Sequence, residues 1–388
     1  MKILIISETI HAGGAETFVL RLARKLIENG EQAEILSLNK DLENQNIIAQ
    51  YPDVKIHHLN LPYLKWIKRI DKILKIAKFD FSMQLFLLKK IITKKYISNY
   101  DVFHSHLFPV DYLMVSLKIK FPKLKLVSTL HGDYNEYETS WNNGVSSRIL
   151  NWPHKVSLVI KWMDHWVYIS KNQKVLFETK YKVASPKFTK IYNGFEAPQM
   201  NIINPLPKLD TSLRFIMVSR GIRMKGWEFL MNAFTKLTGD HQLFIVGEGI
   251  FLDEMKTKFA YDNRIIFLGF SANPIEFIKQ SDVFAFSSIH PTESLPTVII
   301  EALYCGKPVI SNAIGEIPEM IVDVNGHVGG ILIKANDNNE LVEGLLNGMS
   351  TYINDRSLLE KHGKISSRAF AKFDMYSCME SYLKIYKQ

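Results

Sequence analysis

The chain has 388 residues, which suits two domains of about 150–200 residues better than one core. Hydrophobic residues make up 47% of it and charged residues 22%, a balance that excludes a disordered chain. Its two cysteines, Cys305 and Cys378, form no motif and indicate a reducing cytoplasm, and its formal net charge is +9.

The amino-terminal half alternates strand-like and helix-like segments. The run MKILIIS (1–7) is predicted to be a buried first strand, because it is too short for a signal peptide and leads directly into a helical segment. Further β-branched runs follow at DVFHSH (101–106), LKLVSTLH (124–131) and HWVYIS (165–170). This alternation predicts a parallel sheet. No apolar run reaches about 18 residues, so no membrane-spanning helix is predicted.

Nearly all of the excess positive charge lies between residues 63 and 99, which hold ten Lys or Arg and two Asp, a net charge of +8. The segment 63–79 places apolar residues and lysines at helical spacing on different faces, and the segment 85–97 has a similar pattern of apolar residues and lysines. A basic amphipathic helix with Tyr63 and Trp66 is typical of a segment that docks on an anionic membrane. The alternative is an ordinary helix with a solvated lysine face. Nucleic-acid binding is not expected, because no recognised nucleic-acid motif accompanies the patch.

A linker separates two halves of the chain. Residues 192–210 contain three prolines and no clear periodicity, and we place the linker itself at 197–210. Strand and helix patterns restart at LRFIMVS, so the first domain is expected at 1–196 and the second at 211–374. Each doubly wound half should carry its ligand loops at the carboxyl ends of its strands, facing a cleft between the halves.

The segment TESLPTVIIEALYCGKPVI (292–310) contains Glu293 and Glu301 with seven residues between them. It follows a strand-like run and predicts a loop leading into a helix whose first turn contains Pro296. Free N–H groups at a helix N-terminus suit phosphates, and nearby carboxylates suit sugar hydroxyls, so the pair points to a nucleotide sugar. The alternative is that Glu293 belongs to an N-terminal cap and Glu301 is solvated.

Basic residues and glycines follow other strands of the second half. Arg220 and Lys225, with four residues between them, can both point into the cleft and suit a diphosphate, although solvated side chains are the alternative. Gly247, Gly249 and Gly269 lie at strand ends, where glycine permits close backbone approach. The fingerprint G-x-G-x-x-G is missing, so a dinucleotide site is not predicted.

The first half offers a small loop and three histidines. Gly13 and Gly14 precede a helix and can approach phosphates, with a plain tight turn as the alternative. His131 follows a strand and can hydrogen-bond a sugar hydroxyl or a leaving group. Of His104 and His106 we expect only one to face the cleft. The sequence contains no spaced His/Cys set and no Asp-x-Asp at a strand end, so no metal site is predicted.

Together these motifs resemble those of the retaining family-4 glycosyltransferases. The matching stretches, which occur in the family's order along nearly the whole chain, are GGAE (13–16), STLH (128–131), IYNGF (191–195), Arg220-x4-Lys225-Gly226, and Glu293-x7-Glu301 followed by EALYCGKPVI. The resemblance implies an α/β fold of two Rossmann-like domains facing a central cleft (GT-B). It also implies that a final helix, 375–388, packs back on the first domain, and a role in bacterial surface polysaccharide assembly.

The resemblance implies a role for each matching residue. Catalytic residues are expected to be His131, Glu293, Arg220 and Lys225. Donor-binding residues are expected to be Gly14, Asn193, Arg220, Lys225, Gly247, Glu248, Leu268, Ser294, Leu295, Pro296, Thr297 and Glu301, and acceptor-binding residues Gly13, His106 and Asp133. Glu293 is expected to meet the donor sugar and Glu301 the ribose. Arg220 and Lys225 are expected to stabilise the departing diphosphate.

The same resemblance implies a retaining reaction in which the departing phosphate takes the acceptor's proton. The donor is expected to be a UDP-sugar, with GDP open, and no metal or other cofactor is expected. The acceptor is expected to be a saccharide or a polyprenyl-linked saccharide, which puts the enzyme in the cytoplasm on the inner face of the cell membrane.

The chain departs from the family at two places, and two other functions stay open. Many members carry Gly-Phe-Gly after the first glutamate, where this chain has Ser294, Leu295 and Pro296. Pro296 has no N–H, so one potential donor to the sugar is missing. His131 is followed by Gly132 and Asp133, and the alternative to acceptor binding by Asp133 is a turn-forming role. A nucleotide-sugar epimerase or a non-catalytic nucleotide-binding protein are the alternatives.

Overall fold

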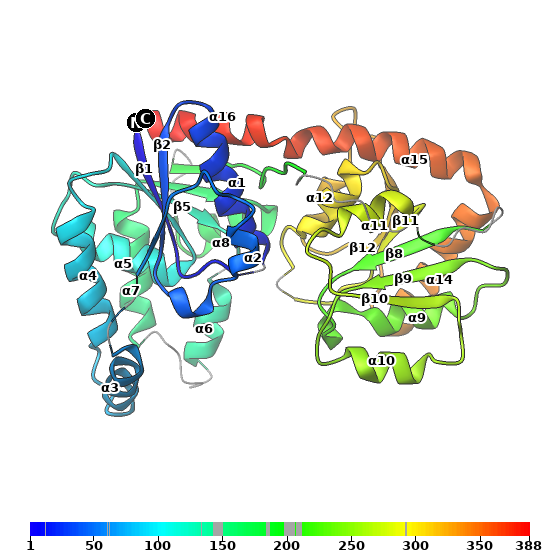
Figure 1. The fold of residues 1–388 in the computed structure, drawn as a ribbon, viewed down its shortest axis with the longest axis horizontal. Helices are drawn as coiled ribbons and strands as arrows, with labels where there is room; N and C mark the ends of the chain where they lie inside the picture. Colours follow the sequence, from blue (N-terminus) through cyan, green and yellow to red (C-terminus); the bar gives the residue numbers. More distant parts are fainter. Residues whose placement is uncertain are drawn as a thin grey trace. The chain divides into compact units, whose positions relative to one another are not determined.

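A computed structural model gives the fold of the chain, which forms two compact units (Figure 1). Unit 1 comprises Met1–Gly194 and Met375–Gln388, and unit 2 comprises Phe195–Asp374. The structure describes residues 1–11, 13–59, 61, 63–132, 134–142, 150–183, 187–197, 206, 212–291 and 293–388. Most of the expected linker at 197–210 therefore lies outside the described residues, as does Asp133.

Unit 1 is built on a parallel sheet in the order β3-β2-β1-β4-β5-β6-β7. The strands are β1 (Lys2–Ser7), β2 (Gln32–Ser37), β3 (Ile56–His58), β4 (Val102–His106), β5 (Lys125–Leu130), β6 (His165–Tyr168) and β7 (Phe188–Lys190). The strand order reverses between β1 and β4. Such a switch point is where doubly wound sheets bind ligands.

Helices cover both faces of this sheet (Figure 1). They are α1 (Gly14–Glu28), α2 (Gln45–Ile48), α3 (Leu64–Ile76), α4 (Met83–Lys95), α5 (Phe108–Lys118), α6 (Asn135–Asn142), α7 (Trp152–Trp162), α8 (Lys171–Thr179) and α16 (Met375–Lys387). Ile3 and Ile5 of β1 pack with α1 and α16, whereas Leu4 and Ile6 pack with α5 and α7. Burial on both faces explains why β1 is apolar at successive positions.

Unit 2 repeats this architecture with the strand order β10-β9-β8-β11-β12-β13, all parallel. The strands are β8 (Arg214–Val218), β9 (Gln242–Val246), β10 (Ile265–Gly269), β11 (Val283–Phe286), β12 (Val309–Asn312) and β13 (Gly330–Ile333). The helices are α9 (Trp227–Phe234), α10 (Leu252–Lys258), α11 (Ile275–Gln280), α12 (Thr297–Tyr304), α13 (Ile317–Met320), α14 (Asn338–Asn354) and α15 (Arg356–Ala369). The prediction of two Rossmann-like domains is confirmed.

The C-terminal helix α16 belongs to unit 1 although the chain reaches it from unit 2. It lies against α1 and buries Met379, Tyr382 and Tyr386 in the core that β1 shares with α1 (Figure 1). A Cβ at Gly194 would lie 2.7 Å from the sulfur of Met375, so the points where the chain leaves and re-enters unit 1 are in contact. Within the described ranges, no helix is both long and apolar enough to cross a membrane.

Candidate active site

In unit 2, three predicted residues follow the two strands at which the sheet order reverses. Arg220 comes two residues after β8 and is exposed, and Lys225 ends a short 3₁₀ helix, Arg223–Lys225, in the same loop. Glu293 lies in the loop that follows β11, the neighbour of β8. Since the carboxyl ends of parallel strands meet at one edge, the fold brings these three residues to the switch point.

Gly226 holds the loop after β8 against the end of β11. Its φ is +74°, and a Cβ at this position would lie 1.9 Å from the carbonyl oxygen of Ser287. The Ser287 hydroxyl donates to the Gly226 carbonyl oxygen at 2.7 Å. Only glycine allows both the left-handed backbone and this close approach. Gly226 therefore fixes the backbone position of the neighbouring Lys225, from which the lysine side chain extends.

Lys225 and Glu293 form an ion pair at this edge. Lys225 Nζ lies 2.5 Å from Glu293 Oε2, and the side chains are only 14% and 11% exposed. The Ser288 hydroxyl donates to the same carboxylate oxygen at 2.9 Å. The sequence prediction did not include Ser288, although its place directly after a buried strand was a usable signal. The site thus has a partly buried cation and anion, with the exposed guanidinium of Arg220 in the same loop as the lysine.

The loop from Glu293 to the start of α12 is fixed by the loop after β12. Gly315 has a φ of +54°, and a Cβ there would lie 2.1 Å from the carbonyl oxygen of Glu293. The Glu316 N–H donates to the Ser294 carbonyl oxygen at 2.8 Å. Ser294 is half-buried, and its role as a donor contact stays a prediction. The sequence prediction also missed Gly315, because nothing in the local sequence indicates the carbonyl oxygen of Glu293 that it approaches.

The start of α12 differs from the expected helix start. Pro296 has extended backbone with a ψ of 114° and stands just before the first helical residue, Thr297, so it is not in the first turn as predicted. Leu295 and Pro296 are buried and pack the loop against the unit, and Thr297 is half-buried. Glu301 is only 9% exposed on α12, so the alternative that it is solvated is wrong.

The glycines after β9 contact the loop after β8. A Cβ at Gly247, where φ is +143°, would lie 1.9 Å from the Ser219 carbonyl oxygen, and one at Gly249 would lie 2.4 Å from that of Gly221. Close approach of backbone to backbone therefore accounts for both glycines. Glu248 between them is exposed. Leu268, half-buried in β10, completes the predicted donor-binding set of unit 2, and its role stays a prediction.

In unit 1, three structural features meet at the switch point between β1 and β4. Gly13 and Gly14 lie between β1 and α1, where Gly13 is the N-cap and Gly14 the first helical residue. His106 ends β4, and His131 directly follows β5. Phe18, one turn into α1, packs edge-on against both histidines, with ring centroids 6.4 and 5.7 Å away. The fold therefore brings these predicted residues together.

The three histidines form one stack, which corrects an expectation. His104 and His106 lie on the same face of β4 with ring centroids 4.3 Å apart, because residues i and i+2 of a strand share a face. The expectation that only one of them faces the cleft assumed that the two side chains alternate across the strand, and that assumption was wrong. His106 stacks on His131 at 4.9 Å, and its Nδ1 lies 2.7 Å from His131 Nε2.

Burial keeps this histidine stack uncharged. It lowers the pKa of His104 and of His131 from 6.5 to about 3, and it lowers the pKa of His106 well below 6.5. Neutral imidazoles in this setting donate or accept hydrogen bonds. They do not supply positive charge. Any contact of His131 with a sugar would therefore be a hydrogen bond.

Asn193, the remaining predicted residue of unit 1, follows β7 and is 5% exposed. Its Oδ1 has no hydrogen-bond partner among the described residues. An unpaired buried amide oxygen marks a place where a ligand donor would be favourable. The contact with a donor stays a prediction.

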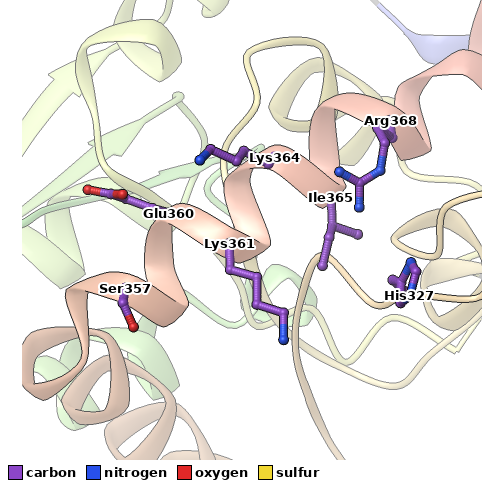
Figure 2. A pocket seen from close by; sticks show the side chains of 7 residues that line it. All are labelled: His327, Ser357, Glu360, Lys361, Lys364, Ile365 and Arg368. Carbon is purple, nitrogen blue, oxygen red and sulfur yellow. The ribbon is translucent and has the colours of Figure 1, made fainter.

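A surface concavity of about 360 Å³ lies elsewhere on unit 2 and is not this site (Figure 2). It is lined by His327, Ser357, Glu360, Lys361, Lys364, Ile365 and Arg368. Most of these side chains come from α15, and Arg368 Nε donates to Asp323 Oδ2 at 2.8 Å. None of the predicted site residues lines it.

Comparison with known proteins identifies the family. The model of "Glycosyltransferase Family 4" matches residues 12–197, and that of "Glycosyl transferases group 1" matches residues 199–365. The chain belongs to the family-4 glycosyltransferases. This glycosyltransferase is therefore an enzyme, and its two Rossmann-like domains are those of the GT-B fold.

Relatives of this glycosyltransferase include proteins from archaea and bacteria. It is 29% identical over 260 residues to an uncharacterized glycosyltransferase of Methanocaldococcus jannaschii, a match that covers 64% of this chain and 59% of that one. It is 24% identical over 385 residues to N-acetylgalactosamine-N,N'-diacetylbacillosaminyl-diphospho-undecaprenol 4-alpha-N-acetylgalactosaminyltransferase of Campylobacter jejuni, covering 96% of each. The solved structure of Anabaena HepE in complex with UDP and glucose superposes with a TM-score of 0.72 at 20% identity, over the whole of both chains.

Proposed function

We propose that the enzyme transfers a sugar, with retention of anomeric configuration, from a nucleotide-diphosphate sugar to a saccharide or lipid-linked saccharide. The observation that carries the proposal is the cluster of Lys225, Glu293 and Ser288 at the switch point of unit 2, with exposed Arg220 in the same loop as Lys225. A diphosphate leaving group needs cations, and a hexose needs a fixed hydrogen-bond acceptor. The cluster offers both types of group.

The chemistry follows from these charges. Arg220 and Lys225 bind the diphosphate and stabilise the charge that develops on it as the glycosidic bond breaks. Glu293, already oriented by Ser288, accepts hydrogen bonds from sugar hydroxyls, and Glu301 those of the ribose. The departing phosphate oxygen takes the proton of the acceptor hydroxyl on the same face. This step uses no side chain as general base and needs no metal ion.

UDP is the favoured nucleotide, and GDP is the alternative. The structure of Anabaena HepE was solved with UDP, which supports this choice. In unit 1, Gly13, His106 and Asp133 are proposed to contact the acceptor, with Gly14, Asn193 and His131 contacting the donor. An epimerase or a non-catalytic binding protein is not favoured, because both family models are those of glycosyltransferases.

The diphosphate assignment is tested with Lys225→Ala. We expect kcat/KM to fall by about 10²- to 10³-fold, the usual effect of removing a charge-stabilising group. Lys256→Ala, which removes an exposed lysine from α10, is the matched control and should keep full activity. A thermal-shift screen of UDP- and GDP-sugars should identify the donor, because a ligand of the native state raises Tm. Unchanged turnover in Lys225→Ala, or an inverted product anomer, would contradict the proposal.

The acceptor is proposed to be attached to a polyprenyl diphosphate at the cytoplasmic face of the membrane. The Campylobacter relative is named for an undecaprenol-linked substrate. In this chain, eight of eighteen exposed large apolar residues of the described ranges lie between residues 63 and 86. They are Tyr63, Trp66, Ile70, Ile73, Ile76, Phe79, Phe81 and Phe86. Trp66, Ile70, Ile73 and Ile76 of α3 are spaced by three or four residues, so they form one stripe along the helix.

The basic residues of α3 border this stripe, and a different face holds the helix to unit 1. Ile67 is only 6% exposed and packs into the unit 1 core, whereas Trp66 and Ile73 are 62% and 66% exposed. Asp71 accepts hydrogen bonds from Ser82 Oγ at 2.8 Å and from the N–H of Met83 at 2.6 Å, where α4 begins. The acidic residue of α3 is thus used to join the helices, which leaves the outer surface apolar and basic.

Vesicle flotation tests this docking surface. The protein should float with anionic phosphatidylglycerol vesicles and not with neutral phosphatidylcholine vesicles. Lys→Glu changes at 65, 68, 72 and 75 should abolish flotation, because each lysine contributes on the order of 1 kcal/mol near an anionic surface. Ile73→Ser should weaken it, whereas Ile250→Ser, at a position that is 95% exposed in unit 2, should not. Wild-type protein that stays at the bottom of the gradient would contradict the proposal.

A further inference from the structure

Two tyrosines of the C-terminal helix α16 hydrogen-bond to the polar cluster of unit 1. Tyr382 and Tyr386 are four residues apart, so they lie on one face of the helix, and they are 0% and 2% exposed. The Tyr386 hydroxyl lies 2.7 Å from His104 Nδ1, and the Tyr382 hydroxyl lies 2.7 Å from Thr129 Oγ1. His104 Nε2 and Thr129 Oγ1 are 2.8 Å apart. The four side chains form one continuous chain of hydrogen bonds.

This chain of hydrogen bonds fixes the orientation of the His104 ring. Both of its ring nitrogens are engaged, and a neutral imidazole has one donor and one acceptor nitrogen. Because hydroxyls can donate or accept, the chain can run in either direction, and each direction corresponds to one tautomer of His104. A bond at each nitrogen also opposes rotation of the ring. Since His104 is fully buried, this is a fixed support inside the unit.

His104 in turn supports the two histidines nearer the carboxyl edge of the sheet. Its ring stacks on His106 at 4.3 Å, and His106 both stacks on and hydrogen-bonds to His131. His106 is 2% exposed, yet its Nε2 has no partner among the described residues. The orientation of His106 therefore depends on one hydrogen bond and on the rings around it. His104 is anchored at both of its nitrogens.

The polar chain is a buried network whose members must all be paired. Phenylalanine at 382 and 386 would fill almost the same volume, but it would leave His104 Nδ1 without its hydroxyl partner. Among the described residues, the hydroxyls of Tyr382 and Tyr386 hydrogen-bond only to Thr129 and His104. Buried polar groups must be paired to be tolerated, and well-packed apolar residues are often more stable. A cluster of this kind is accounted for by what it holds in place.

We propose that Tyr386 and Tyr382 are positioning residues of the glycosyl transfer. They hold the His104 ring in one orientation, and through it they hold His106 and His131 in place against the sugar substrates. The inference rests on the proposed function, which assigns His106 and His131 to substrate contacts. Neither tyrosine touches a substrate, because both are buried behind the histidines that they support.

The test compares three Tyr→Phe variants of the same helix. Tyr386→Phe and Tyr382→Phe should lower kcat by about 10- to 100-fold, the effect of a small misplacement of reacting groups, while the donor KM stays within about twofold. Tyr376→Phe is the matched control, because Tyr376 is 51% exposed, and it should match wild type. Nitrogen-15 spectra of labelled histidine rings should show resonances of His104, His106 and His131 that move in Tyr386→Phe and match wild type in Tyr376→Phe.

The outcomes separate this inference from the proposed function. If the tyrosines only stabilise the fold, Tyr386→Phe and Tyr382→Phe will lower Tm while kcat and the resonances of His106 and His131 stay unchanged, and the inference is overturned. If wild type transfers no sugar from any nucleotide donor, the proposed function fails, and the spectra still decide whether Tyr386 fixes His104. If one variant does not fold, the other carries the kinetic test. UDP-induced thermal shifts should persist in both, since donor binding residues of unit 2 are untouched.

Discussion

Acid should destabilise unit 1, because its histidine stack is held neutral. The pKa of His104 and of His131 is about 3 in the fold, against 6.5 in the unfolded chain. Between these values the unfolded state binds more protons than the folded state, so the free energy of unfolding falls as pH falls from 6.5 towards 3. From pH 7 to pH 5, His104 alone lowers it by about 2 kcal/mol.

Asp111 has the opposite effect on the free energy of unfolding as pH falls. Its buried carboxylate accepts hydrogen bonds from Ser105 Oγ at 2.5 Å and the Tyr134 hydroxyl at 2.6 Å, yet burial raises its pKa from 3.8 to about 6. The folded state therefore takes up this proton first. Its contribution to stability is full below pH 3.8 and is lost as pH rises through 6. From pH 7 to pH 5, protonation of Asp111 raises the free energy of unfolding by about 1 kcal/mol. The two histidines together lower it by more than this amount.

Urea unfolding followed by tryptophan fluorescence measures this balance, since five of the six tryptophans lie in unit 1. Wild type should lose at least about 2–3 kcal/mol of unfolding free energy between pH 7 and pH 5, because His106, whose pKa is also lowered by burial, adds to the loss from His104 and His131. The glutamine of His104→Gln cannot titrate, so this variant should lose about 2 kcal/mol less unfolding free energy than wild type over the same pH range. Asp111→Asn removes the opposing group and should lose about 1 kcal/mol more.

Equal stability of wild type at pH 7 and pH 5 would refute the reasoning. The reasoning would also be refuted if the free energy of unfolding of His104→Gln fell as steeply with pH as that of wild type. Either result would mean that the imidazoles take up protons inside the fold. The histidine stack would then carry charge at mildly acidic pH, and its rings could not be held as neutral hydrogen-bonding groups.

Two further predictions concern the candidate site of unit 2. Gly226→Ala should lower both Tm and kcat/KM, the latter at least about tenfold, because its Cβ meets the Ser287 carbonyl oxygen and displaces Lys225. Gly326→Ala is the matched control, with a φ of +82° and nothing within 4 Å, and equal effects of the two would show that the close approach is unimportant. Treatment with EDTA should leave transfer unchanged, since the proposed chemistry uses lysine and arginine; lost activity restored by a divalent cation would reverse that assignment.

Local sequence signals predicted most of the fold. In unit 2, β8 and β11 are short apolar runs, each leading into a helix, and such runs predict a doubly wound sheet without any long-range information. The meeting of Lys225 with Glu293 follows from the same signals, because every loop after a parallel strand lies at one edge. The predicted helix over 63–79 appears as α3, since its lysines and apolar residues already had helical spacing.

Contacts between distant segments could not be predicted in this way. Nothing in the sequence near Gly226 indicates the Ser287 carbonyl oxygen that a side chain would strike. The bond between Tyr386 and His104 joins residues 282 positions apart, and the apolar pattern of α16 names no partner for a hydroxyl. Glu301 was open to either burial or solvation, because spacing on a helix tells which residues share a face and not what covers it.

The two candidate sites therefore differ in how they are assembled. In unit 2, the ion pair joins loops that end neighbouring strands of one continuous segment, Phe195–Asp374. In unit 1, the histidine stack receives its support from α16, which the chain supplies only after the whole of unit 2. The polar cluster of unit 1 can be complete only when the last helix has docked, and that makes Tyr382 and Tyr386 the residues on which its final geometry depends.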